Sequence, residues 1–213
     1  MESNDNLMLQ GREAMRDKEG KVIMATLVYL LLTVGLQQGI KLMGGRTGEL
    51  IGIPISFLIA GPLTYGLCRY FLLVSRNEEF SLADLFAGFG KLSDTFVTYW
   101  LVFFHVILRM LLLVIPGIIE SIALSQTFYI LNDDDTINPA EAIELSRKMM
   151  DGHKLRYFYL GCRFIGWILL GLITLGIGLL YVIPWMHTTF AKFYDDLKAY
   201  HAADETINPL PTI

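Results

Sequence analysis

The chain has 213 residues, of which 54% are hydrophobic and only 18% are charged, and its formal net charge is −4. Soluble proteins of ordinary composition have about a quarter of their residues charged, so this chain is expected to reside in lipid. The slight excess of acidic residues excludes the broad basic surface of a nucleic-acid-binding protein. Two cysteines, Cys68 and Cys162, lie inside apolar runs and are too few for a disulfide framework.

The first part of the chain predicts two membrane spans. Residues 1–21 are polar and are interpreted as a cytoplasmic N-terminal segment. The uncharged run at 22–40 is long enough to cross about 30 Å of hydrocarbon as a helix. It is longer than the apolar region of a signal peptide and has no small-residue cleavage site, which favours a span. A second apolar run covers residues 50–74.

Two longer apolar blocks each predict a hairpin of two spans. Residues 96–131 are interrupted at Ile115-Pro116-Gly117, and residues 157–191 are interrupted at 174–178, where glycines favour a turn. The predicted fold is therefore all-α, a polytopic six-span transmembrane helical bundle. The membrane domain covers residues 22–197, and residues 198–213 form a cytoplasmic tail.

Two short amphipathic helices are expected between the hairpins, at residues 81–92 and 138–150. A capping-box pattern begins the first, and Pro139 occupies the first helical position of the second. We expect both at the cytoplasmic interface, with Arg147 and Lys148 toward anionic headgroups. Packing on the inner ends of the bundle is an equally good interpretation.

The distribution of positive charge predicts the orientation. Thirteen of the 17 lysines and arginines fall in the two terminal segments and the two connections between hairpins. The opposite side has only Lys41 and Arg46, while Arg109 and Arg163 fall within spans. Both termini are therefore predicted to be cytoplasmic.

A weak threefold repeat accompanies this topology. The second span of each hairpin is expected to open with an Ile-Pro pair, at Ile53-Pro54, Ile115-Pro116 and Ile183-Pro184. Proline is well tolerated in the first turn of a helix. Duplication of one hairpin and coincidence both account for the pattern.

Polar residues at membrane depth are the candidates for function, because charge there is costly. Arg109 and Glu120 flank the predicted turn at 114–116, and at about 1.5 Å per residue both lie roughly 8 Å below the outer surface, where they can pair. His105 lies one helical turn from Arg109 on the same face. His187 and Gln38 reach a similar level from other spans.

We hypothesise an outward-facing polar cavity among Gln38, His105, Arg109, Glu120 and His187. Arg109 would provide the positive charge for an anionic headgroup or carboxylate. Two alternatives remain: the Arg109–Glu120 pair fixes only the register of the hairpin, or Arg109 extends to the outer headgroups.

Other chemistry finds little support in the sequence. The chain contains none of the common nucleotide-binding, zinc-protease or nucleophile-elbow patterns, so neither an enzyme nor a cofactor is expected. Asp133-Asp134-Asp135 lacks the spaced oxygen ligands of a calcium loop and is interpreted as a solvated loop. Arg163 is interpreted as an interfacial anchor.

An ordered series of motifs resembles a known family. It comprises Ile115-Pro116-Gly117-Ile118, Ser146-Arg147-Lys148-Met149-Met150, Gly152-His153-Lys154 and Thr174-Leu175-Gly176-Ile177-Gly178. The chain from Arg12 to Leu197 resembles the bacterial polytopic membrane family catalogued as domain of unknown function 975. It is also distantly similar to the membrane domain attached to some glycerophosphodiester phosphodiesterases. The resemblance implies a location in the bacterial cytoplasmic membrane and carries over no catalytic residues. Arg163 stands where a small polar residue is expected.

Two classes of function follow. The first is a membrane protein that binds or moves a small anionic or lipid-like ligand through the polar cluster. The second is a structural or assembly protein whose cytoplasmic helices dock a partner protein. Membrane lipids are expected partners in both.

Overall fold

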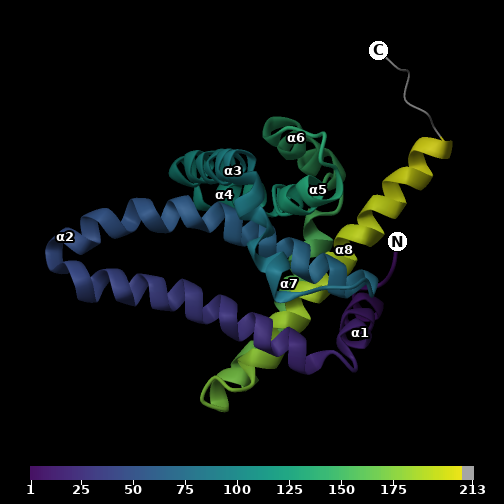
Figure 1. Cartoon of the computed structure of the whole chain (residues 1–213). Coiled ribbons are helices and arrows are strands. Elements are labelled where there is room, and N and C mark those ends of the chain that lie inside the picture. The colour runs from purple at the N-terminus through teal and green to yellow at the C-terminus, as the bar shows by residue number, and fades with distance from the viewer. Residues whose placement is uncertain (208–213) are drawn as a thin grey trace.

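The computed structural model describes the backbone of residues 1–207, and the side chains of that range except 36, 37, 40–54 and 204–207. Every regular element in this range is helical, which confirms the predicted all-α class (Figure 1). The elements are α1 (Asn4–Met15), α2 (Glu19–Arg76), the 3₁₀ helix η1 (Leu82–Lys91), α3 (Leu92–Leu112), α4 (Val114–Ala123), α5 (Thr127–Asp133), α6 (Pro139–Met149), α7 (Lys154–Ile173) and α8 (Leu179–Ile207).

Helix α2 contains both of the first two predicted spans. It runs outward and returns, so that its two ends meet at one end of the molecule (Figure 1). The Tyr70 hydroxyl donates to the Lys21 carbonyl at 3.2 Å, and Lys18 Nζ donates to Asn77 Oδ1 at 3.1 Å. These bonds close the base of the hairpin. Ile53-Pro54, the first pair of the predicted repeat, belongs to the range 40–54, whose side chains the structure does not describe.

The hairpin of α3 and α4 turns two residues before the predicted point. The backbone is extended at Leu113, with φ −161° and ψ 143°, and Pro116 lies in the first turn of α4. Gly117 allows close packing, because a Cβ there would lie 2.8 Å from the Met110 Cα. Helix α4 ends at Ala123, and a turn separates it from α5. The predicted fourth span is therefore two short helices.

The last hairpin turns where the sequence predicts, between the end of α7 at Ile173 and the start of α8 at Leu179. Leu175 and Gly176 adopt positive φ values of 55° and 86°, which reverse the chain. Pro184, however, lies inside α8. The expectation that an Ile-Pro pair opens this helix is wrong, and the third hairpin does not share the layout of the second.

Both short amphipathic helices are present. The predicted capping box begins the first at Ser81, and Pro139 occupies the predicted first position of α6, which also has a capping box at Asn138. The first is a 3₁₀ helix packed closely on α2: a Cβ at Gly66 of α2 would overlap the Leu85 carbonyl. Both helices are thus part of the packed structure, each with buried residues of its own.

The polar N-terminal segment contains a helix that the sequence analysis did not identify. The buried face of α1 comprises Leu7, Gly11, Ala14 and Met15, at helical spacing, and it packs on α8. Trp185 Nε1 donates to the Met8 carbonyl at 2.9 Å. This segment belongs to the packed body of the molecule.

Four helical stretches in the described part of the chain are long and apolar enough to cross a membrane: Ile55–Arg76, Leu82–Leu112, Val114–Asp133 and Lys154–Ile173. Their presence fits a membrane protein. Length and composition alone place no bilayer, and the third stretch contains the turn between α4 and α5.

Candidate functional site

The candidate site is built around one buried carboxylate. Glu120 of α4 has only 3% of its side chain exposed. Arg109 of α3 forms the ion pair with Glu120 across the hairpin that the sequence analysis expected. Arg147 of α6 approaches the same carboxylate, and its Nε donates to Glu120 Oε1 at 2.9 Å. We call these three residues the arginine-pair site.

The turn after α4 brings Arg147 to Glu120. Because the chain turns at Leu124–Gln126, α5 packs on α2 and α6, and α6 lies beside α3. The Ser146 hydroxyl donates to the Ala123 carbonyl at 2.8 Å, which fixes α6 at the end of α4. A sequence pattern gives no contact between helices that are not neighbours in the chain, so Arg147 was missed.

This contact corrects the predicted depths. Glu120 was placed about 8 Å below the outer surface and Arg147 on the cytoplasmic interface, about 22 Å apart across a hydrocarbon core of about 30 Å. The structure joins them directly. The physical reason is that α4 has only 10 residues, which extend about 15 Å and cannot cross that thickness. Arg147, which was expected either toward headgroups or on a helix packed against the bundle, is paired with Glu120.

The arginine-pair site carries excess positive charge. Two guanidinium groups share one carboxylate, and in the described part of the chain neither arginine has an ion pair with any other acidic group. The side chains of Arg109 and Arg147 are 45% and 32% exposed, so their outer N–H groups are accessible. An anion with two oxygen atoms fits such donors, because guanidinium groups bind carboxylates and phosphates in a bidentate manner.

The other residues of the hypothesised cavity are not seen to join this site. His105 lies one turn before Arg109, with its Nδ1 2.7 Å from the Leu101 carbonyl of its own helix. His187 stacks on Phe71, with ring centroids 5.1 Å apart, at the contact of α8 with α2. Gln38 is exposed on α2. The structure therefore brings together Arg109 and Glu120, whereas His187 and Gln38 belong to other helices and other contacts.

A second charged cluster, where α2, α5 and α8 meet, was also missed. Arg76 at the end of α2 binds Asp133 of α5 through both Nη atoms, at 2.6 and 3.0 Å. The same guanidinium binds Asp195 of α8 at 2.7 Å. Tyr194 and Lys198 also donate to Asp133. This network joins the ends of α2 and α5 to the middle of α8, and its charges balance.

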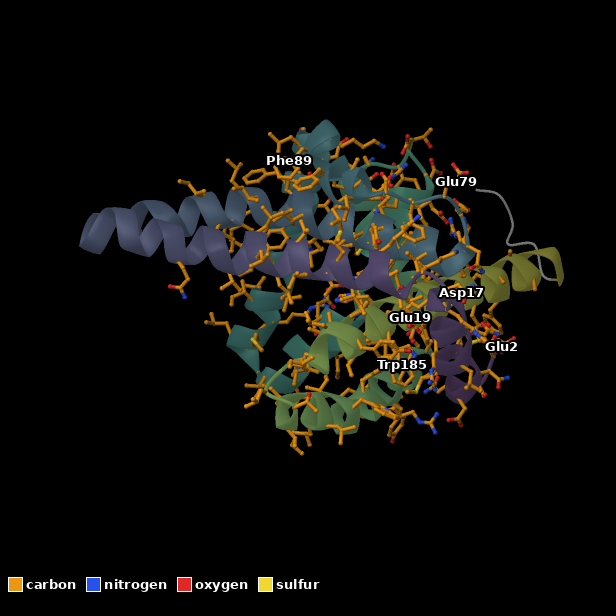
Figure 2. The ribbon with its side chains drawn as sticks, turned by 60° about the horizontal axis from the view of Figure 1, so that its bottom comes forward. Glu2, Asp17, Glu19, Glu79, Phe89 and Trp185 are labelled. Carbon is orange, nitrogen blue, oxygen red and sulfur yellow. The ribbon has the colours of Figure 1, made fainter. Side chains whose placement is uncertain are left out.

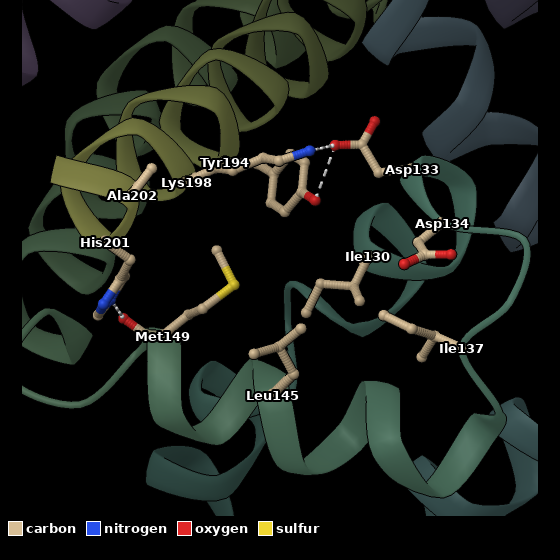
Figure 3. Close-up of a pocket in the computed structure, with 10 residues that line it drawn as sticks. All are labelled: Ile130, Asp133, Asp134, Ile137, Leu145, Met149, Tyr194, Lys198, His201 and Ala202. Carbon is tan, nitrogen blue, oxygen red and sulfur yellow. Dashed lines mark hydrogen bonds and ion pairs between the residues drawn. The ribbon is translucent and has the colours of Figure 1, made fainter. Parts of the chain in front are cut away.

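A cavity of about 260 Å³ lies beside this network, between α5, α6 and α8 (Figure 3). Its walls include Ile130, Leu145 and Met149, whose apolar side chains face the opening, while His201 donates from Nε2 to the Met149 carbonyl, 2.9 Å away. The cavity is smaller than most ligand sites, which have about 300–1,000 Å³.

The aspartate run does not gather around one point. Asp133 lies in the Arg76 network, Asp134 accepts from the hydroxyl and backbone N–H of Thr136, and Asp135 pairs with Lys91. The solvated-loop interpretation is therefore wrong for Asp133, whose side chain is 10% exposed. Among the described residues, no three metal-binding side chains lie close enough together to hold a metal ion.

Arg163 has a specific partner. Its Nη1 lies 2.6 Å from Asp5 Oδ1 of α1, so this residue ties the N-terminal helix to α7. Nearby, Arg156 binds Asp196 at 2.8 Å. The interfacial-anchor interpretation of Arg163 omitted this pair, because the sequence analysis did not place a helix at residues 4–15.

The comparisons with known proteins agree with the motif series. No curated protein and no solved structure matches the chain. The family described as "Protein of unknown function (DUF975)" matches residues 91–201, which include α3 to α7, most of α8 and the whole arginine-pair site. Because this match covers more than half of the sequence, the chain belongs to the DUF975 family.

Proposed function

We propose that this chain is a multi-span protein of the bacterial cytoplasmic membrane, with both termini in the cytoplasm, that binds an anionic, lipid-like ligand at the arginine-pair site. The observation that carries the proposal is the two-to-one ratio of guanidinium groups to the buried Glu120 carboxylate. One positive charge is left over in a segment with candidate membrane-spanning helices on both sides. Uncompensated charge at such a place is expensive, and a bound anion would neutralise it.

The surroundings of the site favour a ligand that also has an apolar part. Leu108, Leu111 and Leu112 of α3 are 65%, 85% and 75% exposed. They lie within one helical turn of Arg109. A headgroup bound by the arginines would therefore place its hydrocarbon chain against this exposed surface. An anionic phospholipid and a fatty carboxylate share the required chemistry.

Native mass spectrometry on the full chain in mild detergent tests this proposal, with phosphatidylglycerol as the probe. Arg109→Gln and Arg147→Gln should each weaken its binding about tenfold, the effect of losing one charge-assisted pair. Arg163→Gln is the matched control, because it removes an arginine from another predicted span whose partner is the exposed Asp5. Thermal unfolding of each variant shows that the fold is retained.

Equal binding by all four proteins would contradict the proposal and leave the three residues as a purely structural link between α3, α4 and α6. The alternative function, docking of a cytoplasmic partner on η1 and α6, would then become the stronger hypothesis. Arg109→Lys and Arg147→Lys provide a second test, because they keep the charge and lose the bidentate geometry.

A further inference from the structure

A polar pocket lies at the base of the α2 hairpin, far along the chain from the arginine-pair site. It has a volume of about 420 Å³, within the usual range of ligand sites, and it opens widely to the outside. Its wall contains charges of both signs from both ends of α2: Lys18, Lys21, Asn77, Glu78, Glu79 and Phe80. We call it the head pocket.

The charges of the head pocket are largely unused within the protein. Lys18 is held by Asn77 and lies 5.6 Å from the centre of the Phe80 ring. By contrast, Lys21, Glu78 and Glu79 take part in none of the ion pairs found in the described part of the chain. Positive and negative side chains therefore line the same pocket, and together they can bind a ligand that carries both charges.

An apolar groove lies farther along the same hairpin. It has a volume of about 390 Å³ and is lined by both limbs of α2 and by η1, through Leu31, Leu32, Gly35, Ile59, Leu63, Phe86 and Phe89. Every lining residue is apolar or glycine. We call it the tail groove.

The two sites are arranged like the two parts of a lipid. Lys21 and Leu32 are 11 residues apart on one helix, which places them about 16 Å apart along its axis and close to the same face. The segment from Asn77 to Phe89 contributes to both sites. Figure 2 shows this course: Glu79 and Glu19 lie at the same end of the hairpin, and Phe89 lies farther along its limbs.

From this arrangement we propose that the α2 hairpin binds one zwitterionic phospholipid whose headgroup carries a primary ammonium group, as in phosphatidylethanolamine. Lys18 and Lys21 bind the phosphate, Glu78 and Glu79 accept hydrogen bonds from the ammonium, and an acyl chain occupies the tail groove. A quaternary ammonium has no N–H to donate and is recognised by aromatic cages, whereas this pocket offers only one ring, which already faces Lys18. An anionic lipid lacks the cation that the two glutamates require.

The test uses the full chain in mild detergent, titrated with dioleoyl phosphatidylethanolamine, phosphatidylcholine or phosphatidylglycerol and followed by native mass spectrometry. The wild type should bind phosphatidylethanolamine about fivefold more tightly than phosphatidylcholine, a ratio typical of partly exposed ionic contacts. Glu78→Gln with Glu79→Gln should remove this preference. Glu13→Gln with Glu144→Gln makes the same change of charge at exposed positions elsewhere and should keep it.

A second variant tests the tail groove independently of the charges. A Cβ at Gly35 meets no atom within 4 Å, so Gly35→Phe can be accommodated and its ring would fill the groove. It should weaken binding of the lipid about fivefold or more, whereas Gly166→Phe, at another open glycine, should not. Soluble phosphoethanolamine should fail to compete, because it has no acyl chain; competition by it would indicate a site for a free phosphorylated amine and overturn the lipid proposal.

Equal affinity of the wild type for the two zwitterionic lipids would also overturn it. So would an unchanged preference in the glutamate variant together with unchanged affinity in the Gly35 variant. The result is separable from the proposed function, since Arg109→Gln should lower binding of phosphatidylglycerol and leave the preference for phosphatidylethanolamine unchanged.

Discussion

The packed end of the molecule and the tips of its hairpins place the same kinds of residue in opposite environments. At the packed end, Phe164, Leu160 and Phe193 are completely buried among α1, α2, α5, α6, α7 and α8. At the tips, Leu111 at the end of α3 and Leu175 between α7 and α8 are 85% and 94% exposed. The hydrophobic content of the chain is therefore divided between a protein core and a surface without protein contacts.

The difference indicates which solvent each region meets. Contiguous exposed apolar surface is rare on soluble proteins, whereas it costs nothing in hydrocarbon. The packed end also has most of the ion pairs between helices, such as Arg76–Asp133 and Arg156–Asp196. We infer that packing and charge hold the packed end together, and that lipid covers the tips.

The largest effect is expected from removing a large buried ring. Phe164→Ala should lower the free energy of unfolding by about 3–5 kcal/mol, because the ring packs edge-to-face on Trp185 and leaves a cavity when removed. Leu175→Ala, at a tip, should change it by less than about 0.5 kcal/mol. Chemical unfolding in mild detergent measures both; similar losses would contradict the comparison.

A close helix contact should rank second. Gly66→Ala should cost about 3 kcal/mol, because its Cβ would overlap the Leu85 carbonyl and force α2 away from η1. Gly166→Ala, where a Cβ meets no atom within 4 Å, should be neutral or slightly stabilising. Thermal unfolding compares the two, and an unchanged melting temperature for Gly66→Ala would mean that η1 packs less closely than described.

The Arg76 network at the packed end should contribute less to the free energy of unfolding than the two contacts above. Arg76→Gln should lower stability by about 2 kcal/mol, because it leaves Asp133 and Asp195 without their shared partner while Lys198 still neutralises part of the charge. Lys148→Gln, which breaks an exposed pair with Glu144, should cost only about 0.3–0.5 kcal/mol. Equal effects in unfolding experiments would show that the network is solvated.

The smallest effect is expected from pH. Burial, His201 and Arg156 lower the pKa of His153, which precedes α7. Because the folded pKa lies below the unfolded value of about 6.5, the unfolded chain binds this proton first, and stability falls as the pH drops below that value. His153→Gln should flatten this part of the stability profile between pH 7 and pH 5. An identical profile in the variant would exclude His153 as its source.

Local patterns in the sequence were sufficient for the two short amphipathic helices and for the turn of the last hairpin. Capping at Ser81 and Asn138, and the turn at 174–178, depend on residues close together in the chain. The helix at residues 4–15 could have been found from the spacing of Leu7, Gly11, Ala14 and Met15. The Arg109–Glu120 pair was accessible for a related reason, because both residues flank one hairpin turn.

Contacts between distant helices were beyond the sequence. Arg147 meets Glu120 because α5 and α6 fold back after a short α4, and no periodicity encodes that return. Likewise, the partners of Asp133 come from α2 and α8, on opposite sides of it in the chain. A rule that assigns every apolar run to one straight helix also misses the turn between α4 and α5.

By itself, the sequence determined that this protein is helical and rich in apolar surface, because composition and helical periodicity are properties of neighbouring residues. Only the tertiary structure decided which charges meet: two arginines on Glu120, a balanced network around Arg76, and unpaired charges of both signs at the base of α2. The physical reason is that the energy of a charge in or near a membrane depends on its distance from other charges and on its burial, and both are set by how the helices pack.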